Sequence, residues 1–221
     1  MAIQAIVFDL DGVILDSEEI WNSVRKDFAL AHGGRWDEHD QPAVMGANSM
    51  QWAAYMREAS GIPLSDEEIY AGIVQALKEE YARHLPLVSG AREVIEQLAS
   101  RYRLGVASSS PRELIECALE LAGLAGHFSA VVSSDEVPVG KPAPDVYLEA
   151  CRRLEAEPEQ AVAVEDSSNG IASAAAAGLV VVAVPNSVYP PTAEALGLAR
   201  VVLGSISELS PGLIASVGAS S

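Results

Sequence analysis

The sequence predicts an α/β protein with a doubly wound, mainly parallel sheet and an inserted all-helical cap. Six short apolar runs alternate with helix-like stretches along the 221 residues. The runs are nearly continuous in apolar residues, as expected for parallel strands that are covered on both faces. The first run is followed by an interval too long for one crossover helix, after which the alternation resumes.

The predicted strands are the apolar runs at residues 3–8, 104–107, 130–132, 161–164, 180–184 and 201–203. Helix-like stretches accompany the later strands, at residues 91–100, 112–122, 145–155 and 168–177. Alternation of this kind favours a doubly wound sheet over a sandwich or a helical bundle.

The long interval after the first strand separates it from the second by about 95 residues, whereas a crossover needs only about a dozen. It reads as helices at residues 18–32, 50–59 and 66–85, with residues 36–46 as a loop. Ser65 with Glu68 three positions later is a capping box for the third helix. We therefore predict an α/β catalytic core from residues 1–16 and 88–221, and a helical cap from residues 17–87.

The composition is acidic, with 14 basic against 31 acidic residues and a formal net charge of −17. Such a surface disfavours binding to nucleic acid and to anionic membranes. The apolar runs are too short to cross a bilayer, and no targeting segment is apparent, so we expect a cytoplasmic protein, taken as a monomer. Any anion-binding site in so acidic a chain needs local cations, and a bound metal ion would supply them.

Two acidic pairs follow two of the predicted strands. Asp9 and Asp11 come after the first strand, and Glu165 and Asp166 end the strand at 161–164. The first pair alone fits a solvated turn equally well. However, the carboxyl ends of parallel strands meet at one edge, and four converging carboxylates would repel one another without a divalent cation. Ligands that are all oxygen favour Mg²⁺.

Two further segments could hold a phosphate. Ser108 and Ser109 follow the second strand and precede a helix, where hydroxyl and main-chain N–H groups can bind an anion, although serines also cap ordinary helices. Lys141 is a lone lysine in a loop rich in Gly and Pro. Taken alone it would be a surface lysine, but its context and the scarcity of cations suggest that it neutralises phosphate charge.

Taken in order, these elements resemble the four motifs of the haloacid dehalogenase-like superfamily. The motifs are Asp9-Leu10-Asp11-Gly12-Val13, Ser108, Lys141-Pro142 and Glu165-Asp166. The resemblance covers essentially the whole chain, and the helical insert looks like that superfamily's C1-type cap. Asp16-Ser17-Glu18 after the first motif resembles the branch of sugar phosphatases and β-phosphoglucomutases.

The resemblance implies a role for each motif residue. Asp9 would attack the phosphate, form an aspartyl-phosphate and bind Mg²⁺. Asp11 would protonate the leaving oxygen and then activate water, while its main-chain carbonyl would bind the metal. Ser108 and the following backbone would hold the phosphoryl oxygens, and Lys141 would orient the nucleophile.

The second acidic pair completes the implied metal site. Asp166 would bind Mg²⁺ directly, with Glu165 beside it or reaching it through water. The implied function is a magnesium-dependent phosphatase that hydrolyses a small phosphorylated metabolite, such as a sugar phosphate.

Three cap residues are candidates for contacts with the substrate: Trp21, Asn48 and Lys78. Each has an ordinary structural alternative, namely core packing for Trp21, helix capping for Asn48 and a solvated helix face for Lys78.

A β-phosphoglucomutase-like phosphomutase remains the alternative enzyme. However, the cap lacks the histidine and the Gly-Val-Ser-Arg loop expected of one, with Ile20-Trp21-Asn22 and Gly46-Ala47-Asn48-Ser49 at the matching places. A phospho-accepting signalling receiver also uses an acidic cluster, a hydroxyl and a lysine. Receivers, however, lack such a helical insert, and their acidic pair and phosphorylated aspartate lie on separate strands.

Overall fold

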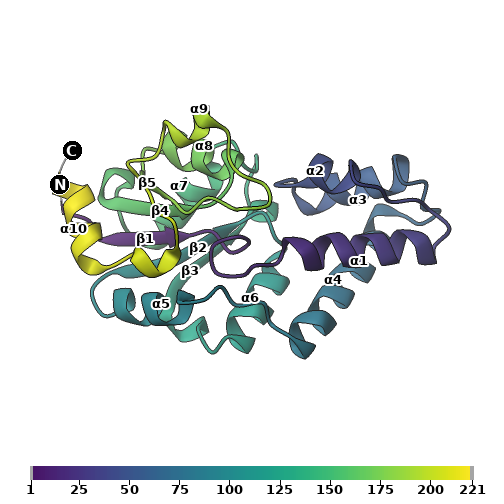
Figure 1. The fold of residues 1–221 in the computed structure, drawn as a ribbon, viewed down its shortest axis with the longest axis horizontal. Helices are drawn as coiled ribbons and strands as arrows, with labels where there is room; N and C mark the ends of the chain where they lie inside the picture. The colour runs from purple at the N-terminus through teal and green to yellow at the C-terminus, as the bar shows by residue number, and fades with distance from the viewer. Residues whose placement is uncertain (1, 220–221) are drawn as a thin grey trace.

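A sheet of parallel strands forms one part of the molecule and a group of helices forms the other (Figure 1). The computed structural model describes residues 2–219. The six strands are β1 (Ala5–Phe8), β2 (Arg103–Ser108), β3 (Phe128–Ser133), β4 (Ala161–Glu165), β5 (Val180–Ala183) and β6 (Val201–Val202). They lie in the order β3-β2-β1-β4-β5-β6, and all pairs are parallel. The predicted α/β fold is confirmed.

The first strand alternates its side chains between two apolar cores. Ile6 and Phe8 belong to one cluster, and Ala5 and Val7 belong to the other. Helices α5 (Ala91–Ala99), α6 (Arg112–Leu121) and α10 (Pro211–Ala219) contribute to the first cluster. Helices α7 (Asp145–Arg153), α8 (Ser168–Ala176) and α9 (Ala193–Leu196) contribute to the second. Because successive side chains of a strand point to opposite faces, burial on both sides requires this continuous apolar run.

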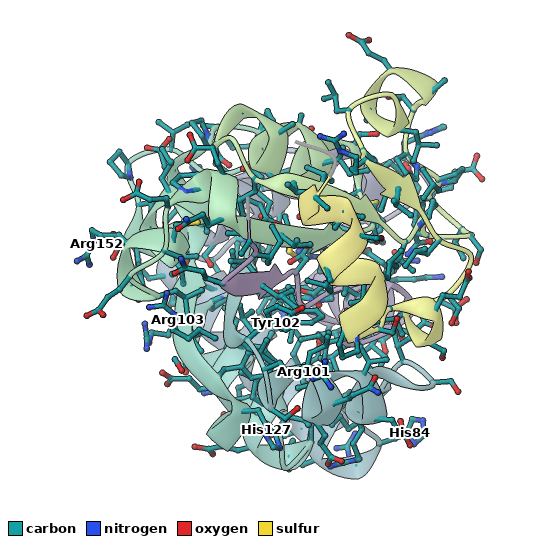
Figure 2. The ribbon with its side chains drawn as sticks, turned by 90° about the vertical axis from the view of Figure 1, so that its left-hand side faces the viewer. His84, Arg101, Tyr102, Arg103, His127 and Arg152 are labelled. Carbon is teal, nitrogen blue, oxygen red and sulfur yellow. The ribbon has the colours of Figure 1, made fainter. Side chains whose placement is uncertain are left out.

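The strand register brings the carboxyl ends of the central strands together. Phe8 pairs with Val106 of β2 and with Val164 of β4. Asp9, Ser108 and Asp166 therefore emerge at the same edge of the sheet. Arg101, Arg103 and His127 lie at the opposite end of the sheet (Figure 2), so these basic side chains do not offset charge at the edge where Asp9 emerges.

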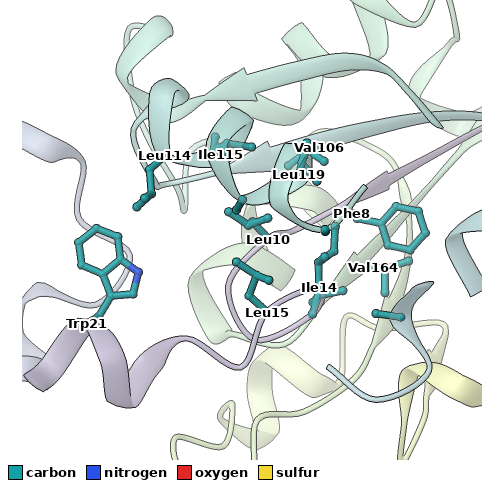
Figure 3. Close-up of a cluster of buried hydrophobic side chains, with 14 of the residues drawn as sticks. Phe8, Leu10, Ile14, Leu15, Trp21, Val106, Leu114, Ile115, Leu119 and Val164 are labelled. Carbon is teal, nitrogen blue, oxygen red and sulfur yellow. The ribbon is translucent and has the colours of Figure 1, made fainter. Parts of the chain in front are cut away.

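The loop after β1 is fixed by apolar packing against α6. Leu10, Ile14 and Leu15 are fully buried. Figure 3 shows them beside Leu114, Ile115 and Leu119 of α6 and Val106 of β2. Asp9 and Asp11 flank Leu10, so this packing fixes the backbone that carries both carboxylates.

Between β1 and α5 the chain forms four helices: α1 (Glu18–Ala31), α2 (Asp40–Val44), α3 (Ser49–Glu58) and α4 (Asp66–Arg83). The capping box of Ser65 and Glu68 begins α4 as the sequence predicts. The reading of residues 36–46 as a loop is wrong, because α2 lies inside it. A helix of five residues shows no helical periodicity, and tertiary contacts stabilise this one: Asp40 accepts a hydrogen bond from Tyr55, and Gln41 accepts one from Arg25.

The two chain segments that join these helices to the sheet run side by side. The backbone N–H of Asp16 donates to Pro86, and that of Val88 donates to Ile14, at 2.8 and 2.9 Å. Leu15 and Leu87 form an antiparallel bridge. The division between cap and core at residues 17 and 87 remains a prediction. Among residues 2–219, no helix has both the length and the apolar character needed to cross a membrane.

Candidate active site

Three buried carboxylates meet one buried ammonium at the carboxyl edge of the sheet. Asp9, Glu165 and Asp166 each offer an oxygen, and these oxygens lie within 4.8 Å of one another. Nζ of Lys141 lies 3.0 Å from Oδ2 of Asp9 and 2.6 Å from Oε1 of Glu165. The ends of β1 and β4, which are adjacent in the sheet but distant in the sequence, thus form one cluster with the loop that carries Lys141.

The electrostatics of the cluster favour an added cation. Burial, and then the charge of Glu165, raise the pKa of Asp9 well above its ordinary value, while Lys141 opposes the shift. Burial and the charges of Glu165 and Asp9 raise the pKa of Asp166 in the same way. Burial alone would lower the pKa of Lys141, but Asp9 and Glu165 raise it above its usual value. One ammonium does not neutralise three carboxylates, and the oxygen donors suit a hard divalent cation.

Glu165 lies behind the other carboxylates and holds Lys141 in place. It is fully buried and is absent from the cavity lining. Oε1 accepts hydrogen bonds from Lys141 and from the Tyr147 hydroxyl, and Oε2 accepts from the backbone of Asp166 and the N–H and hydroxyl groups of Ser167. Because both of its oxygens accept hydrogen bonds, Glu165 orients Lys141 and the loop after β4 and does not itself face the cavity.

Gly12 allows Asp166 to approach the loop after β1. Its φ of 83° lies in the left-handed region, which favours glycine. A Cβ atom at this position would lie 1.9 Å from Oδ2 of Asp166. The glycine in the first motif is therefore needed for the backbone conformation and for the space that the carboxylate occupies.

The carboxylate of Asp11 lies outside the cluster of three. Oδ1 accepts hydrogen bonds from the Ser17 hydroxyl at 2.5 Å and from Nε1 of Trp21 at 3.2 Å. Oδ2 accepts from the hydroxyl groups of Ser110 at 2.6 Å and Ser108 at 3.4 Å. The structure thus gathers three of the four expected carboxylates. It directs Asp11 toward the cap and toward the loop of Ser108, Ser109 and Ser110, here called the serine loop.

The serine loop after β2 closes another side of the site. The backbone N–H of Ser110 donates to Oγ of Ser108, and the Ser133 hydroxyl donates to the carbonyl of Ser110. The Ser109 hydroxyl reaches the carbonyl of Gly46 in the cap at 3.2 Å. Ser108, Ser109 and Ser110 all line the cavity, so their polar groups can hold an anion there.

A cavity of about 260 Å³ lies between the sheet edge and the inserted helices. The core side includes Asp9, Asp11, Lys141, Asp166 and the three serines. The side formed by the inserted helices includes Glu18, Trp21, Arg25, Gln41 and Trp52. The volume and the mixed lining suit a small phosphorylated molecule.

Of the three candidate cap residues, Trp21 alone lines this cavity. Asn48 begins α3, where its side chain accepts a hydrogen bond from the N–H of Gln51 in a capping box. Lys78 of α4 pairs with Glu113 of α6, away from the cavity. Asn48 thus caps a helix, which was its alternative, whereas Lys78 forms an ion pair with α6 rather than lying on a solvated face; contacts of either residue with a substrate remain predictions.

Glu18, Arg25 and Gln41 also line the cavity, and the sequence did not mark them as candidates for substrate contacts. A signal existed for Arg25, which follows Trp21 by four positions and therefore shares its face of α1.

Comparison with known proteins identifies the family. The model of the haloacid dehalogenase-like hydrolase family matches residues 3–178. A phosphorylated carbohydrates phosphatase of Thermotoga maritima is 32% identical over 178 residues, which are 80% of this chain and 82% of that one. Hexitol phosphatase B of Escherichia coli is 32% identical over 214 residues, 94% of each chain.

Solved structures agree with this grouping. The structure of CbbY from Rhodobacter sphaeroides in complex with phosphate superposes with a TM-score of 0.86 at 27% identity, and covers 97% of this chain and 99% of that one. The fold also matches β-phosphoglucomutase from Clostridium difficile, with a TM-score of 0.81 at 23% identity over 99% and 98% of the two chains. With four motifs meeting at one sheet edge and relatives that share most of its length, the chain belongs to the haloacid dehalogenase-like hydrolase family of phosphatases.

Proposed function

We propose that this enzyme is a magnesium-dependent phosphatase that hydrolyses a small sugar phosphate through an aspartyl-phosphate on Asp9. The observation that carries the proposal is the position of Asp9, which lines the cavity between Lys141 and Asp166. A carboxylate held beside a buried ammonium can approach a phosphoryl group whose charge that ammonium offsets.

The residues of the site fit Mg²⁺. Asp9 and Asp166 would hold the ion, joined by the main-chain carbonyl of Asp11 that the family resemblance implies, with Glu165 behind them. The raised pKa values of Asp9 and Asp166 support this assignment, because burial, and then the neighbouring carboxylates, disfavour their ionised forms, which a bound cation would favour. When bound, the ion supplies positive charge that stabilises the phosphoryl oxygens.

The residues of the chain then divide the chemistry into two transfers. In the first, a carboxylate oxygen of Asp9 forms a bond to phosphorus while the ester bond to the sugar breaks. Asp11 gives a proton to the leaving oxygen, which requires it to turn from its serine partners into the cavity. Ser108 and Lys141 hold the phosphoryl oxygens throughout.

The second transfer releases phosphate. A water molecule attacks phosphorus, Asp11 takes its proton, and the bond between phosphorus and Asp9 breaks. The enzyme returns to its starting state with inorganic phosphate as product.

The substrate class rests on the relatives and on the cavity. The relatives are described as phosphatases of phosphorylated carbohydrates and of hexitol phosphates. CbbY has also been solved in complex with xylulose-(1,5)bisphosphate, at 27% identity and a TM-score of 0.84. A phosphomutase must retain and reorient a bisphosphate intermediate, and the histidine and arginine motif expected for that task is missing here. We therefore favour release of phosphate to water.

The test is a panel of sugar phosphates with Mg²⁺, read by phosphate release, with Asp9→Asn as the inactive variant. Asp9→Asn keeps the shape of the side chain but removes the nucleophile, so turnover should fall by more than about 1,000-fold. The control is Asp27→Asn on the exposed face of α1, which should leave turnover unchanged. Appreciable turnover by Asp9→Asn would contradict covalent catalysis. Isomerised hexose phosphate in place of inorganic phosphate would make the enzyme a phosphomutase.

A further inference from the structure

Arg25 is a buried cation in the cavity wall that the chemistry at Asp9 does not use. The residue is 5% exposed. Its guanidinium carbon lies 4.4 Å from the ring centre of Trp21 and 5.4 Å from that of Trp52. Burial lowers the pKa of Arg25 to about 10, against the opposing charges of Glu18 and Asp11. A buried arginine is costly unless its donors find acceptors, so its presence at a cavity requires a reason.

Arg25 is one end of a hydrogen-bonded row on the cavity wall. Nη1 of Arg25 donates to Oε1 of Gln41 at 3.0 Å. Nε2 of Gln41 in turn donates to Oε2 of Glu18 at 3.1 Å. All three residues line the same cavity as Asp9. Gln41 is thus fixed by both of its neighbours, and the row has a donor at one end and an acceptor at the other.

The row leaves hydrogen-bonding capacity unused. Nε of Arg25 is buried without a hydrogen-bond partner, and within residues 2–219 the bond to Gln41 is the only one that its guanidinium makes. Oε1 of Glu18 likewise accepts no hydrogen bond from the described residues. A ligand that supplies both acceptors and donors would complete the row.

The charges of this wall restrict the chemistry of that ligand. Arg25 and Glu18 carry opposite charges, and Asp11 adds a negative charge nearby. A second phosphate group would therefore meet no net positive charge here. Hydroxyl groups both donate and accept, so they match the row.

We propose that Arg25, Gln41 and Glu18 form a specificity site for a polyol monophosphate or a sugar monophosphate. The site binds hydroxyl groups at the uncharged end of the substrate, away from its phosphate, and disfavours bisphosphates. The inference rests on the proposed function, because it requires the phosphate end of the substrate at Asp9. It assigns these three residues to binding and none of them to a step of the phosphoryl transfer.

The first test compares substrates within one variant. For Arg25→Met we measure kcat/KM for a hexitol monophosphate and for p-nitrophenyl phosphate, which has no hydroxyl-bearing tail. Loss of charge-assisted hydrogen bonds should lower the ratio of the two constants by roughly 10- to 100-fold. The matched control is Arg35→Gln, since Arg35 is an exposed cap arginine paired with Asp37, and it should keep the wild-type ratio. An unchanged ratio in Arg25→Met would overturn the proposal.

The second test isolates the charge of the row. Glu18→Gln keeps an oxygen that can accept from Gln41 but removes a negative charge near the proposed hydroxyl site. The ratio of kcat/KM for a ketose bisphosphate to that for a hexitol monophosphate should rise by about 10-fold. A ratio that does not rise, or a wild-type enzyme that prefers the bisphosphate, overturns the proposal.

The results distinguish failure of the specificity site from failure of the proposed phosphatase function. If Asp9→Asn abolishes hydrolysis of p-nitrophenyl phosphate while neither ratio changes, the phosphatase stands and the specificity site falls. If hydrolysis persists without Asp9, the proposed function falls, and the specificity site falls with it.

Discussion

Lys141 donates a 2.6 Å hydrogen bond to Glu165, and both side chains are buried. The same ammonium lies 3.0 Å from Asp9. Because Glu165 is fixed by Tyr147 and by backbone N–H groups, it fixes the ammonium in turn. The cation that lines the cavity beside Asp9 is thus positioned by a carboxylate that does not itself line the cavity.

Removal of that ammonium should destabilise the fold. Lys141→Met leaves Asp9 and Glu165 buried without their cation, so the free energy of unfolding should fall by about 3–5 kcal/mol. Urea unfolding measures the change. Lys78→Met is the control, because Lys78 pairs with Glu113 at a more exposed site and should lose less than about 1 kcal/mol. Equal losses of unfolding free energy in the two variants would show that the buried ion pairs of Lys141 stabilise the fold no more than the exposed pair of Lys78.

Gly12→Ala tests the close approach of Asp166. The added Cβ would overlap Oδ2 of Asp166, so we expect Mg²⁺ affinity, measured by calorimetry, to fall by at least about 10-fold. Gly61→Ala is the matched control: its φ of 74° imposes the same backbone strain of roughly 1–2 kcal/mol, but nothing lies within 4 Å of the added atom. If both variants bind Mg²⁺ as the wild type does, Gly12 is needed only for its backbone conformation and not for the space that Asp166 occupies.

Mg²⁺ should stabilise the protein more at high pH than at low pH. The raised pKa values of Asp9 and Asp166 mean that the folded, metal-free protein retains protons that the unfolded chain releases. Its stability therefore falls as pH rises from the ordinary value of 3.8 through the raised one. Mg²⁺ binds the ionised carboxylates, so it competes with those protons and offsets the loss.

Thermal melts with and without Mg²⁺, at about pH 5.5 and about pH 8, measure this effect. At a free concentration about 100 times the dissociation constant, binding adds about 2.7 kcal/mol, or roughly 5–10 °C in melting temperature. Asp166→Asn should lose most of the gain. A gain that is larger at acidic pH would contradict the assignment of the ligands.

The contacts that hold the cap against the core offer a test of cap movement. Asp135 accepts from the N–H and hydroxyl groups of Ser49 at 3.0 and 2.5 Å, at the start of α3. Glu113 pairs with Tyr70 and Lys78 of α4. We propose that residues 17–87 move as one body about the two adjacent segments, near residues 14–16 and 86–88, that join them to the sheet. Asp135→Ala should then raise KM by roughly 5- to 100-fold, about 1–3 kcal/mol for the two lost hydrogen bonds, and speed hydrogen exchange in α3.

The control for cap movement is Asp27→Ala, at an exposed position of α1, which should leave exchange in α3 as it is. An Asp135→Ala protein with wild-type exchange and KM would show that this contact does not hold the cap closed.

Much of the fold and of the site follows from local sequence. Buried parallel strands require continuous apolar runs, and the run at 161–164 becomes β4 with one added residue. The positions of Asp9, Ser108 and Asp166 at strand ends then follow from the sheet itself. The orientation of Asp11 does not, because it depends on Ser17, Trp21 and Ser110, which reach it only after folding.

Two features of the cap, helix α2 and the burial of Arg25, could not be predicted for a related reason. Helix α2 is too short to show periodicity, and Arg25 reads as one of many charged residues on an amphipathic helix. Its burial is produced by Trp52 of α3 and Gln41 of α2, whose positions depend on tertiary packing. Lys78 shows the opposite error: it is a plausible substrate-binding cation by sequence, but in the structure it pairs with Glu113 and does not line the cavity.

The most direct test of the account is to trap the phosphorylated carboxylate. Enzyme quenched in acid during turnover of a sugar phosphate is reduced with borohydride, which converts an aspartyl-phosphate to homoserine, and its peptides are read by mass spectrometry. We predict homoserine at position 9, only with substrate and Mg²⁺ present. Sustained phosphate release with an unmodified Asp9, or with the label at another carboxylate, would contradict the central claim.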